Sequence, residues 1–227
     1  MCGRYSFAPS AKQLEAQMLD AQRPLALQIS FNIAPTQEAY VVTYDAAAIW
    51  QRMAWGLVPR WSPDGKNKGQ LINARAESIA EKPSFREPIR SRRCLVPADS
   101  FYEWSQVPGG RKVPHRILLA NGELMWMAGI WDEWEQGGGA AKRTFSIITT
   151  TPNREMAELH HRMPVILAEP AAQHQWLAEG ELSELLPLLR PLPDGALRSY
   201  RVSEQLNKPG YDQPDVQDEV PGEWRLF

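Results

Sequence analysis

The residue that offers the clearest chemistry is Cys2, the second residue of the chain. Because aminopeptidases remove an initiator Met that precedes a small residue, we expect the mature chain to begin Cys2-Gly3-Arg4. A free α-amine then lies next to the thiol. The α-amine has a pKa of roughly 7.7–8.0, against about 10.4 for a Lys side chain. A useful part of this amine is therefore neutral and nucleophilic near neutral pH.

Two reactions suit an amine and a thiol on one residue. In the first, Cys2 hydrolyses an amide as an N-terminal nucleophile, with its own amine as the base. In the second, the amine captures an aldehyde as a Schiff base, and the thiol closes on the same carbon to give a thiazolidine. Gly3 permits close approach of a substrate, and Arg4 offers a guanidinium for a phosphate. The alternative is a Cys2 without a chemical role.

Two further segments carry polar residues that could assist. Asn73 and Arg75 follow a basic loop; an amide can orient an amine or a sugar oxygen, and an Arg can bind a phosphate. A solvated helix start is the other interpretation of this segment. In Phe101-Tyr102-Glu103-Trp104, a carboxylate lies within an aromatic strand. Burial there would raise the pKa of Glu103 and suit proton transfer, whereas an edge strand would leave the carboxylate in water.

The pair His160-His161 holds two of the four histidines. Histidine is the side chain best suited to proton transfer near pH 7. A metal site is not expected, because the two cysteines and four histidines lack the spacing of zinc ligands. We expect His115 and His174 to be structural or exposed.

The composition is that of an ordinary globular protein, with 227 residues of which 43% are hydrophobic and 23% charged. We expect a cytoplasmic protein, because no apolar run is long enough to span a bilayer and the first residues lack a secretory signal. A net charge of −2 gives no global sign of nucleic-acid binding. Residues 60–93 are rich in Lys and Arg, which favours either a polyanion site or a solvated loop.

The pattern of short strands with few, late helices predicts one α+β domain over residues 1–227, built on an antiparallel sheet or open barrel with flanking helices. Strands are expected at residues 39–44, 49–57, 94–97, 100–104, 115–120, 124–131, 144–150, 163–167 and 197–202, and helices at residues 11–21, 152–159, 169–178 and 181–189. Residues 59–70 read as a loop, and residues 207–223 as polar and irregular. Trp50, Trp126 and Trp131 are expected in the core.

Seven short motifs occur in order along the chain, and together with the N-terminal Cys they are specific. They are Met-Cys-Gly-Arg-Tyr, Phe-Asn-Ile-Ala-Pro, Trp-Gly-Leu-Val-Pro, Ile-Asn-Ala-Arg-Ala-Glu, Cys-Leu-Val-Pro-Ala, Phe-Tyr-Glu-Trp and His-His-Arg-Met-Pro. This series resembles the SRAP (SOS response-associated peptidase) family over about residues 1–205. The region after Asn207 departs from the family.

The resemblance implies a sensor of abasic sites in single-stranded DNA, because an abasic deoxyribose opens to the aldehyde that an aminothiol captures. It gives the sites these roles: Cys2 as covalent nucleophile, Asn73 holding the terminus and sugar, Glu103 assisting ring opening and proton transfer, His160 protonating the departing sugar oxygen, Arg4, Arg75 and Arg162 binding phosphates, and Asn32 and Pro35 lying against the unstacked strand. No cofactor or metal is implied. The expected partners are abasic single-stranded DNA and proteins of the replication fork, with no membrane, and we take the protein as a monomer associated with the nucleoid during DNA damage.

One departure concerns the loop after Trp-Gly, where family members can carry two consecutive Trp and this chain has Trp61-Ser62. Only Trp61 is then available to stack on a base, which is worth about 1–3 kcal/mol per base. Two other functions remain open on the sequence: an N-terminal-nucleophile peptidase or amidase, including self-cleavage, and a non-covalent single-strand binder.

Overall fold

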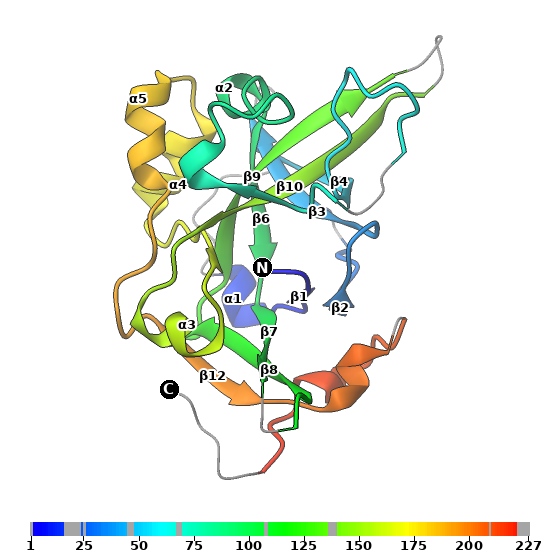
Figure 1. Ribbon diagram of the computed structural model, residues 1–227, viewed down its shortest axis with the longest axis vertical. Helices are drawn as coiled ribbons and strands as arrows, with labels where there is room; N and C mark the ends of the chain where they lie inside the picture. The colour runs from blue at the N-terminus through cyan, green and yellow to red at the C-terminus, as the bar shows by residue number, and fades with distance from the viewer. Residues whose placement is uncertain are drawn as a thin grey trace.

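The computed structural model describes residues 2–15, 24, 26–44, 48–66, 70–106, 109–135, 140–208 and 210–221. Two β-sheets dominate it, and most of the helices lie toward the edge of the view (Figure 1). The trace that leads into the first strand crosses the centre of the view rather than an extremity, and Cys2 is fully buried. The first residues of the chain are therefore surrounded by elements that come from many parts of the sequence.

The first sheet has five antiparallel strands in the order β12-β8-β7-β1-β2. Their bounds are β1 Tyr5–Phe7, β2 Ser30–Ile33, β7 Ser100–Gln106, β8 Lys112–Leu119 and β12 Leu197–Arg201. Strand β1 lies inside this sheet, with Tyr5 opposite Ile33 on one side and Phe101 on the other. All three residues of β1 are buried, so pairing on both edges and packing on both faces fix the start of the chain.

The second sheet closes on itself. The ladder runs β10-β4-β3-β6-β9, and β9 pairs again with β10, which makes a five-stranded barrel. The bounds are β3 Glu38–Tyr44, β4 Ala48–Trp55, β6 Arg93–Ala98, β9 Met125–Trp134 and β10 Lys142–Thr150. The short strands β5 Asn73–Arg75 and β11 Met163–Pro164 add to β10. Strand β10 pairs in parallel with β4 and β5, and the other pairs are antiparallel.

The helices are short. They are α1 Ala11–Glu15, α2 Pro88–Ser91, α3 Arg154–Leu159, α4 Pro170–Leu177 and α5 Leu182–Leu185, with 3-10 turns η1 Ala76–Ser78, η2 Leu186–Leu188, η3 Glu204–Asn207 and η4 Pro214–Gln217. Asn153 is the N-cap of helix α3, and its side-chain oxygen accepts a hydrogen bond from the amide of Met156 at 3.1 Å. Among the described residues, none of these helices is long and apolar enough to cross a membrane.

The core contains the tryptophans that the sequence places there. Trp50, Trp126 and Trp131 are all buried, as predicted. Trp50 contacts Trp126 edge-on, with ring centroids 5.8 Å apart, and Tyr40 and Phe7 pack against the same ring. Such aromatic pairs add to the hydrophobic burial and join β1 of the first sheet to β3 and β4 of the barrel.

The predicted α+β class is confirmed, and several boundaries differ. Strands β1, β2 and β5 are missing from the prediction, because segments of three or four residues are too short to show an alternating pattern. Strand β8 starts at Lys112 rather than at residue 115. It contains Pro114, a residue type that argues against a strand when only the sequence is known. In residues 163–167 the ladder covers only Met163–Pro164, followed by an isolated bridge at Ile166. The helix predicted at residues 11–21 is present as α1 from Ala11 to Glu15. Residues 16–21 of this prediction lie outside the described residues.

The segment after Asn207 is more ordered than its polar sequence suggests. The turn η4 buries Val216 in a small cluster with Tyr102 and Leu206. The amide of Phe31 donates to Asp212, and the amide of Val220 donates to the carbonyl of Arg201. The C-terminal segment is therefore part of the first sheet's surroundings.

Gly129 of β9 tests the packing between the strands of the barrel. A Cβ there would lie 2.9 Å from the Cys94 sulfur and 3.2 Å from the Ser146 carbonyl oxygen. We expect Gly129→Ala to lower the free energy of unfolding by about 1–3 kcal/mol, as overpacked core substitutions do. Urea unfolding followed by circular dichroism measures this.

The matched control for Gly129 is Gly180, where the nearest atom to an added Cβ is 3.8 Å away. Gly180→Ala should change stability by less than about 0.5 kcal/mol in either direction. Equal effects at the two sites would contradict the tight packing inferred at Gly129.

Candidate active site

The residues before β1 are held in place by the sheet and by the barrel. The amide of Tyr102 donates to the carbonyl of Arg4 at 2.9 Å, which extends the pairing of β1 with β7. The side-chain amide of Asn73 donates to the carbonyl of Cys2 at 2.9 Å. Cys2 is fully buried, and its sulfur lies 3.9 Å from the Arg4 carbonyl oxygen. Asn73 therefore ties Cys2 to the barrel wall.

Asn73 occupies this position because of β10. The segment before it is fixed by two hydrogen bonds to the carbonyl of Ile72, one from the Trp55 indole at 2.9 Å and one from the Ile147 amide at 3.0 Å. Asn73 itself is paired with Ile147 in the parallel ladder. Its side-chain oxygen is buried and accepts no hydrogen bond from the described residues. The segment Asn73–Arg75 is a strand, which the sequence did not predict, and the helical turn that the alternative interpretation expected begins only at Ala76.

The carboxylate of Glu103 is buried, not exposed at the edge of a sheet. It lies on β7 opposite His115 of β8 and is only 4% exposed. Burial raises the pKa of Glu103 above its ordinary value. Burial, and then the negative charge of Glu103, raise the pKa of the Cys2 thiol. Glu103 is therefore a buried carboxyl group close enough to Cys2 to affect its thiol, and burial favours the neutral form of both groups.

His160 directly follows α3 and is the half-buried member of the histidine pair. The backbone amide of Arg162 donates to Nδ1 of His160 at 3.0 Å. Burial lowers the pKa of His160, so the ring is neutral at pH 7. Nδ1 also lies 3.2 Å from the carbonyl oxygen of Arg162. Because the backbone amide always carries its proton, Nδ1 is assigned as an acceptor and the proton of the neutral ring is assigned to Nε2. His161 is exposed and stacks on His160, with ring centroids 4.2 Å apart.

Glu103 and His160 line one cavity of about 620 Å³. Trp104, Arg111 and Lys112 line it too, together with residues of η3. The structure thus brings Cys2, Asn73, Glu103 and His160 to one place: Asn73 through its hydrogen bond, Glu103 through its electrostatic effect on the thiol, and His160 through the shared cavity. These four are the residues that the sequence gives as catalytic.

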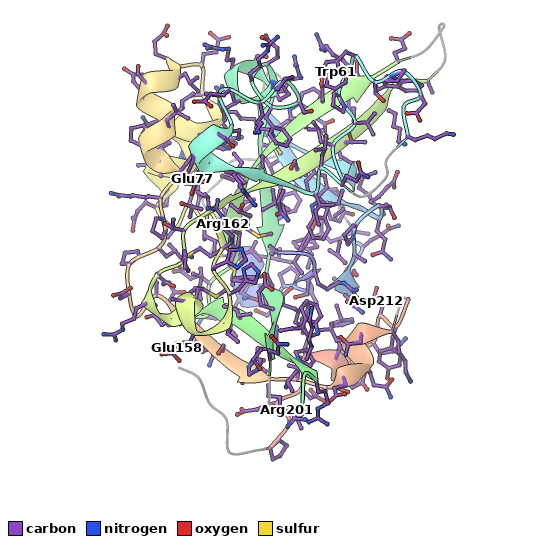
Figure 2. All side chains as sticks on the ribbon, in the orientation of Figure 1. Trp61, Glu77, Glu158, Arg162, Arg201 and Asp212 are labelled. Carbon is purple, nitrogen blue, oxygen red and sulfur yellow. The ribbon has the colours of Figure 1, made fainter. Side chains whose placement is uncertain are left out.

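The predicted phosphate ligands are in three different settings. Arg162 is buried, and both of its terminal nitrogens bond to the carboxylate of Glu77, at 2.7 and 2.9 Å. Glu77 and Arg162 face each other in Figure 2. Arg4 donates to the side chain of Asn32 at 2.7 Å and to the Leu206 carbonyl at 3.1 Å. Arg75 is exposed. Their roles toward phosphate stay predictions.

The residues predicted to lie against the DNA strand also differ in position. Asn32 is buried, and its amide donates to the carbonyls of Leu206 and Tyr211, so it acts here as part of a structural network. Pro35 is half-buried. Trp61 is 61% exposed and borders a separate cavity of about 200 Å³. Figure 2 shows Trp61 at the upper end of the view, away from Arg162 and Glu77.

The sequence reasoning did not select Trp104, Arg111 and Lys112, which line the cavity with Glu103 and His160. A signal was present: Arg111-Lys112 follows two glycines after the strand that carries Glu103. A hairpin brings the two strands together, with Gln106 opposite Lys112. The other histidines are as expected: His115 is buried with its Nε2 2.9 Å from the Ser105 hydroxyl, and His174 is exposed.

Comparison with known proteins identifies the family. The family model described as "SOS response associated peptidase (SRAP)" matches residues 1–209. The abasic site processing protein YoqW of Bacillus subtilis is 37% identical over 221 residues, covering 95% of this chain and 98% of YoqW. YoaM of the same organism, also an abasic site processing protein, is 38% identical over 96% of this chain and 98% of its own.

A solved structure from Bacteroides thetaiotaomicron superposes with a TM-score of 0.77 and 30% identity, covering 85% of this chain and 86% of that one. The chain belongs to the SRAP family.

The pair Arg162–Glu77 gives a prediction on stability. Glu77 is half exposed, whereas Arg162 is buried and depends on this carboxylate. We expect Glu77→Gln to lower the free energy of unfolding at pH 7 by about 1 kcal/mol, a modest value because solvent screens the exposed side. Chemical unfolding at fixed pH measures the effect.

The pH dependence of that loss has a defined sign. The hydrogen bonds to Arg162 lower the pKa of Glu77 in the folded state. The pair's contribution is therefore present above the ordinary carboxyl pKa and disappears as the pH falls through the lowered value. The difference between wild type and Glu77→Gln should shrink from pH 7 to pH 3. Glu81→Gln, at an exposed carboxylate nearby in sequence, should show no such trend.

Proposed function

We propose that this protein senses abasic sites in single-stranded DNA and links to them covalently through Cys2, once Met1 has been removed. The observation that carries the proposal is the hydrogen bond from Asn73 that holds Cys2 beside the buried Glu103. The names of YoqW and YoaM, which match this chain over nearly their whole length, support the substrate class. Cytoplasmic location, monomeric state and partners at replication forks remain predictions.

The reaction that suits this site starts with the α-amine of Cys2. The pKa of the thiol is raised by burial and by Glu103, so the thiol is the weaker nucleophile at the outset. The amine adds to the C1′ aldehyde of the open-chain deoxyribose, and water leaves to give a Schiff base. The thiol then adds to the same carbon: the sulfur–carbon bond forms, and the thiol proton passes to the Schiff-base nitrogen. The product is a thiazolidine, with one water lost overall.

Glu103 and Asn73 assist different steps. A carboxyl group with a raised pKa exchanges protons near neutrality, so Glu103 relays the proton that leaves the thiol and the one that leaves with water. Asn73 fixes the Cys2 backbone through its amide, and its buried oxygen is an acceptor for the α-amine. This holding removes much of the entropic cost of bringing the amine to the aldehyde.

His160 acts on the sugar. The hydrogen bond from the Arg162 amide occupies Nδ1, which leaves the Nε2 proton as a donor within the cavity shared with Glu103. This donor hydrogen-bonds the ring oxygen as the sugar opens. The exposed Arg75 supplies positive charge for a phosphate, Trp61 a stacking surface, and Pro35 a wall against which the strand lies. Arg4, Arg162 and Asn32 have polar groups that bond to protein partners; the two arginines add positive charge, and Asn32 supports this wall from behind.

Single-stranded DNA suits this site better than a duplex, because C1′ is hindered in a stacked helix. A groove with phosphate contacts and a few aromatic rings binds without reading the sequence.

The first test is intact mass spectrometry of the mature protein after incubation with an oligonucleotide that carries one abasic site, followed by denaturation. We expect the mass of the protein without Met1 plus the oligonucleotide minus one water. Cys2→Ser should give no denaturant-stable species. Resistance to borohydride distinguishes the thiazolidine from a Schiff base.

The outcomes separate the three functions that the sequence leaves open. Binding that salt reverses and that never becomes covalent indicates a non-covalent binder. A mature protein that forms no adduct but hydrolyses amides through Cys2 would sink the proposal and favour the N-terminal-nucleophile hydrolase. A denaturant-stable adduct with Cys2→Ala would also overturn it.

A second variant tests the proton-transfer group. Glu103→Gln keeps the shape of the side chain and removes its titration. We expect adduct formation to slow by about a hundredfold at pH 7, at the lower end of what general acid–base catalysis contributes. As the pH falls, protonation of the α-amine slows both proteins, and protonation of Glu103 slows the wild type further. This additional fall in rate should be absent in the variant. An unchanged rate and an unchanged profile would exclude a proton-transfer role for Glu103.

A further inference from the structure

The cavity that holds Glu103 and His160 extends beyond them to the end of the β7–β8 hairpin. Its volume of about 620 Å³ falls in the range of roughly 300–1,000 Å³ that accommodates a drug-sized ligand, which is more than one sugar requires. The additional lining comes from Trp104 of β7, Arg111 and Lys112 of β8, and the turn η3. These side chains have no part in the reaction proposed above.

The position of these residues on the hairpin sets the path of a ligand. Successive side chains of a strand alternate between its faces, so Glu103 and Trp104 point to opposite sides of β7. Trp104 is opposite Pro114, and Gln106 is opposite Lys112, which places Trp104 and Lys112 on the same face. Because the cavity is lined by both Glu103 and Trp104, it curves around the edge of the hairpin from the reacting residues to this second face.

The second face carries excess positive charge. Arg111 and Lys112 are both exposed. Apart from Glu103, which points to the other face of β7, the acidic residue of the lining is Glu204, which lies 3.7 Å from both Arg111 and Arg201. With Arg111 61% and Glu204 43% exposed, this is a long, solvated pair of the kind that contributes little. A phosphate can therefore engage Arg111 and Lys112 without breaking a buried ion pair.

Trp104 supplies an aromatic surface beside these cations. Its indole nitrogen donates to the side chain of Asn207 at 2.8 Å, which fixes the orientation of the ring. The ring is half-buried and lines the cavity. An oriented aromatic ring next to paired cations is the combination by which proteins hold single-stranded nucleic acid without reading its sequence.

We propose that Trp104, Arg111 and Lys112 form a nucleotide subsite on the end of the β7–β8 hairpin, which binds the base and the backbone phosphates of a nucleotide adjoining the abasic residue. The subsite extends the proposed function and rests on it for the identity of the strand. It gives the protein a grip on one flank of the lesion that lies apart from Trp61.

Binding and adduct formation are measured separately, so that the subsite and the proposed chemistry can each be rejected independently. Binding is measured by fluorescence anisotropy with single-stranded DNA carrying tetrahydrofuran, an abasic analogue without an aldehyde, at several salt concentrations. Adduct formation is measured with the true abasic strand. Each strand is made with the lesion at the centre, near the 5′ end or near the 3′ end.

For the double variant Arg111→Gln/Lys112→Gln we expect affinity to fall about tenfold at low salt. The slope of log K against log salt should become shallower by about 1.4, since each phosphate contact on a single strand contributes about 0.7. The loss should appear with strands extended on one side of the lesion and vanish when that side is removed. The rate of adduct formation at saturating protein should stay within twofold of wild type.

The matched control is Lys12→Gln/Arg190→Gln, which removes the same charge from exposed positions elsewhere. Lys12 lies on α1, and its neighbour Gln13 bonds to Gly122, beyond the far end of β8. Arg190 follows η2. This variant should keep the wild-type preference for strands extended on the affected side.

Trp104→Leu tests the aromatic part of the subsite. It should lose affinity for a strand with a base next to the lesion and match wild type when tetrahydrofuran replaces that neighbouring nucleotide. A double variant with unchanged slope, or with losses equal on both sides of the lesion, overturns the subsite. Absence of any adduct with wild type, together with the expected one-sided loss in anisotropy, would reject the proposed chemistry and keep the subsite.

Discussion

The hydrogen bond from Asn73 to the carbonyl of Cys2 is the contact on which the site depends. Chain ends are usually mobile, because few contacts restrain them. Here β1 is paired on both edges and buried on both faces, and Asn73 then fixes Cys2, three residues before the start of β1. Asn73 can do so only because β5 joins the barrel beside β10. The closed barrel thus positions a side chain that restrains the start of the first sheet.

Burial sets the electrostatics around this contact. Glu103 is nearly excluded from water, which raises its pKa, and its charge adds to the desolvation of the Cys2 thiol. The same low-dielectric surroundings lower the pKa of His160. Each group is therefore shifted toward its neutral form, so that protons can be exchanged at low cost between neighbours instead of being held as fixed charges. Arg162, by contrast, is a buried cation that forms an ion pair with Glu77.

The extent to which sequence predicts this structure depends on the length of each pattern. Long strands such as β9 and β10 and the core tryptophans could be read from hydrophobic patterning. The three-residue strands that position Cys2 and Asn73 could not, because their partners are distant in sequence and no local pattern marks them. Candidate residues were recognisable from motifs, whereas the pairing of Arg162 with Glu77 and the contribution of Lys112 to the cavity required the fold.

The carbonyl of Leu206 accepts hydrogen bonds from both Arg4 and Asn32, so the last part of the chain completes the surroundings of the first. Protein synthesis runs from the N-terminus, and these contacts therefore form only after residue 206 and the segment beyond it have left the ribosome. Until then the surroundings of Arg4 and Asn32 are incomplete. For the removal of Met1 proposed above, the order of synthesis itself provides a period in which the N-terminus can be processed before folding is complete.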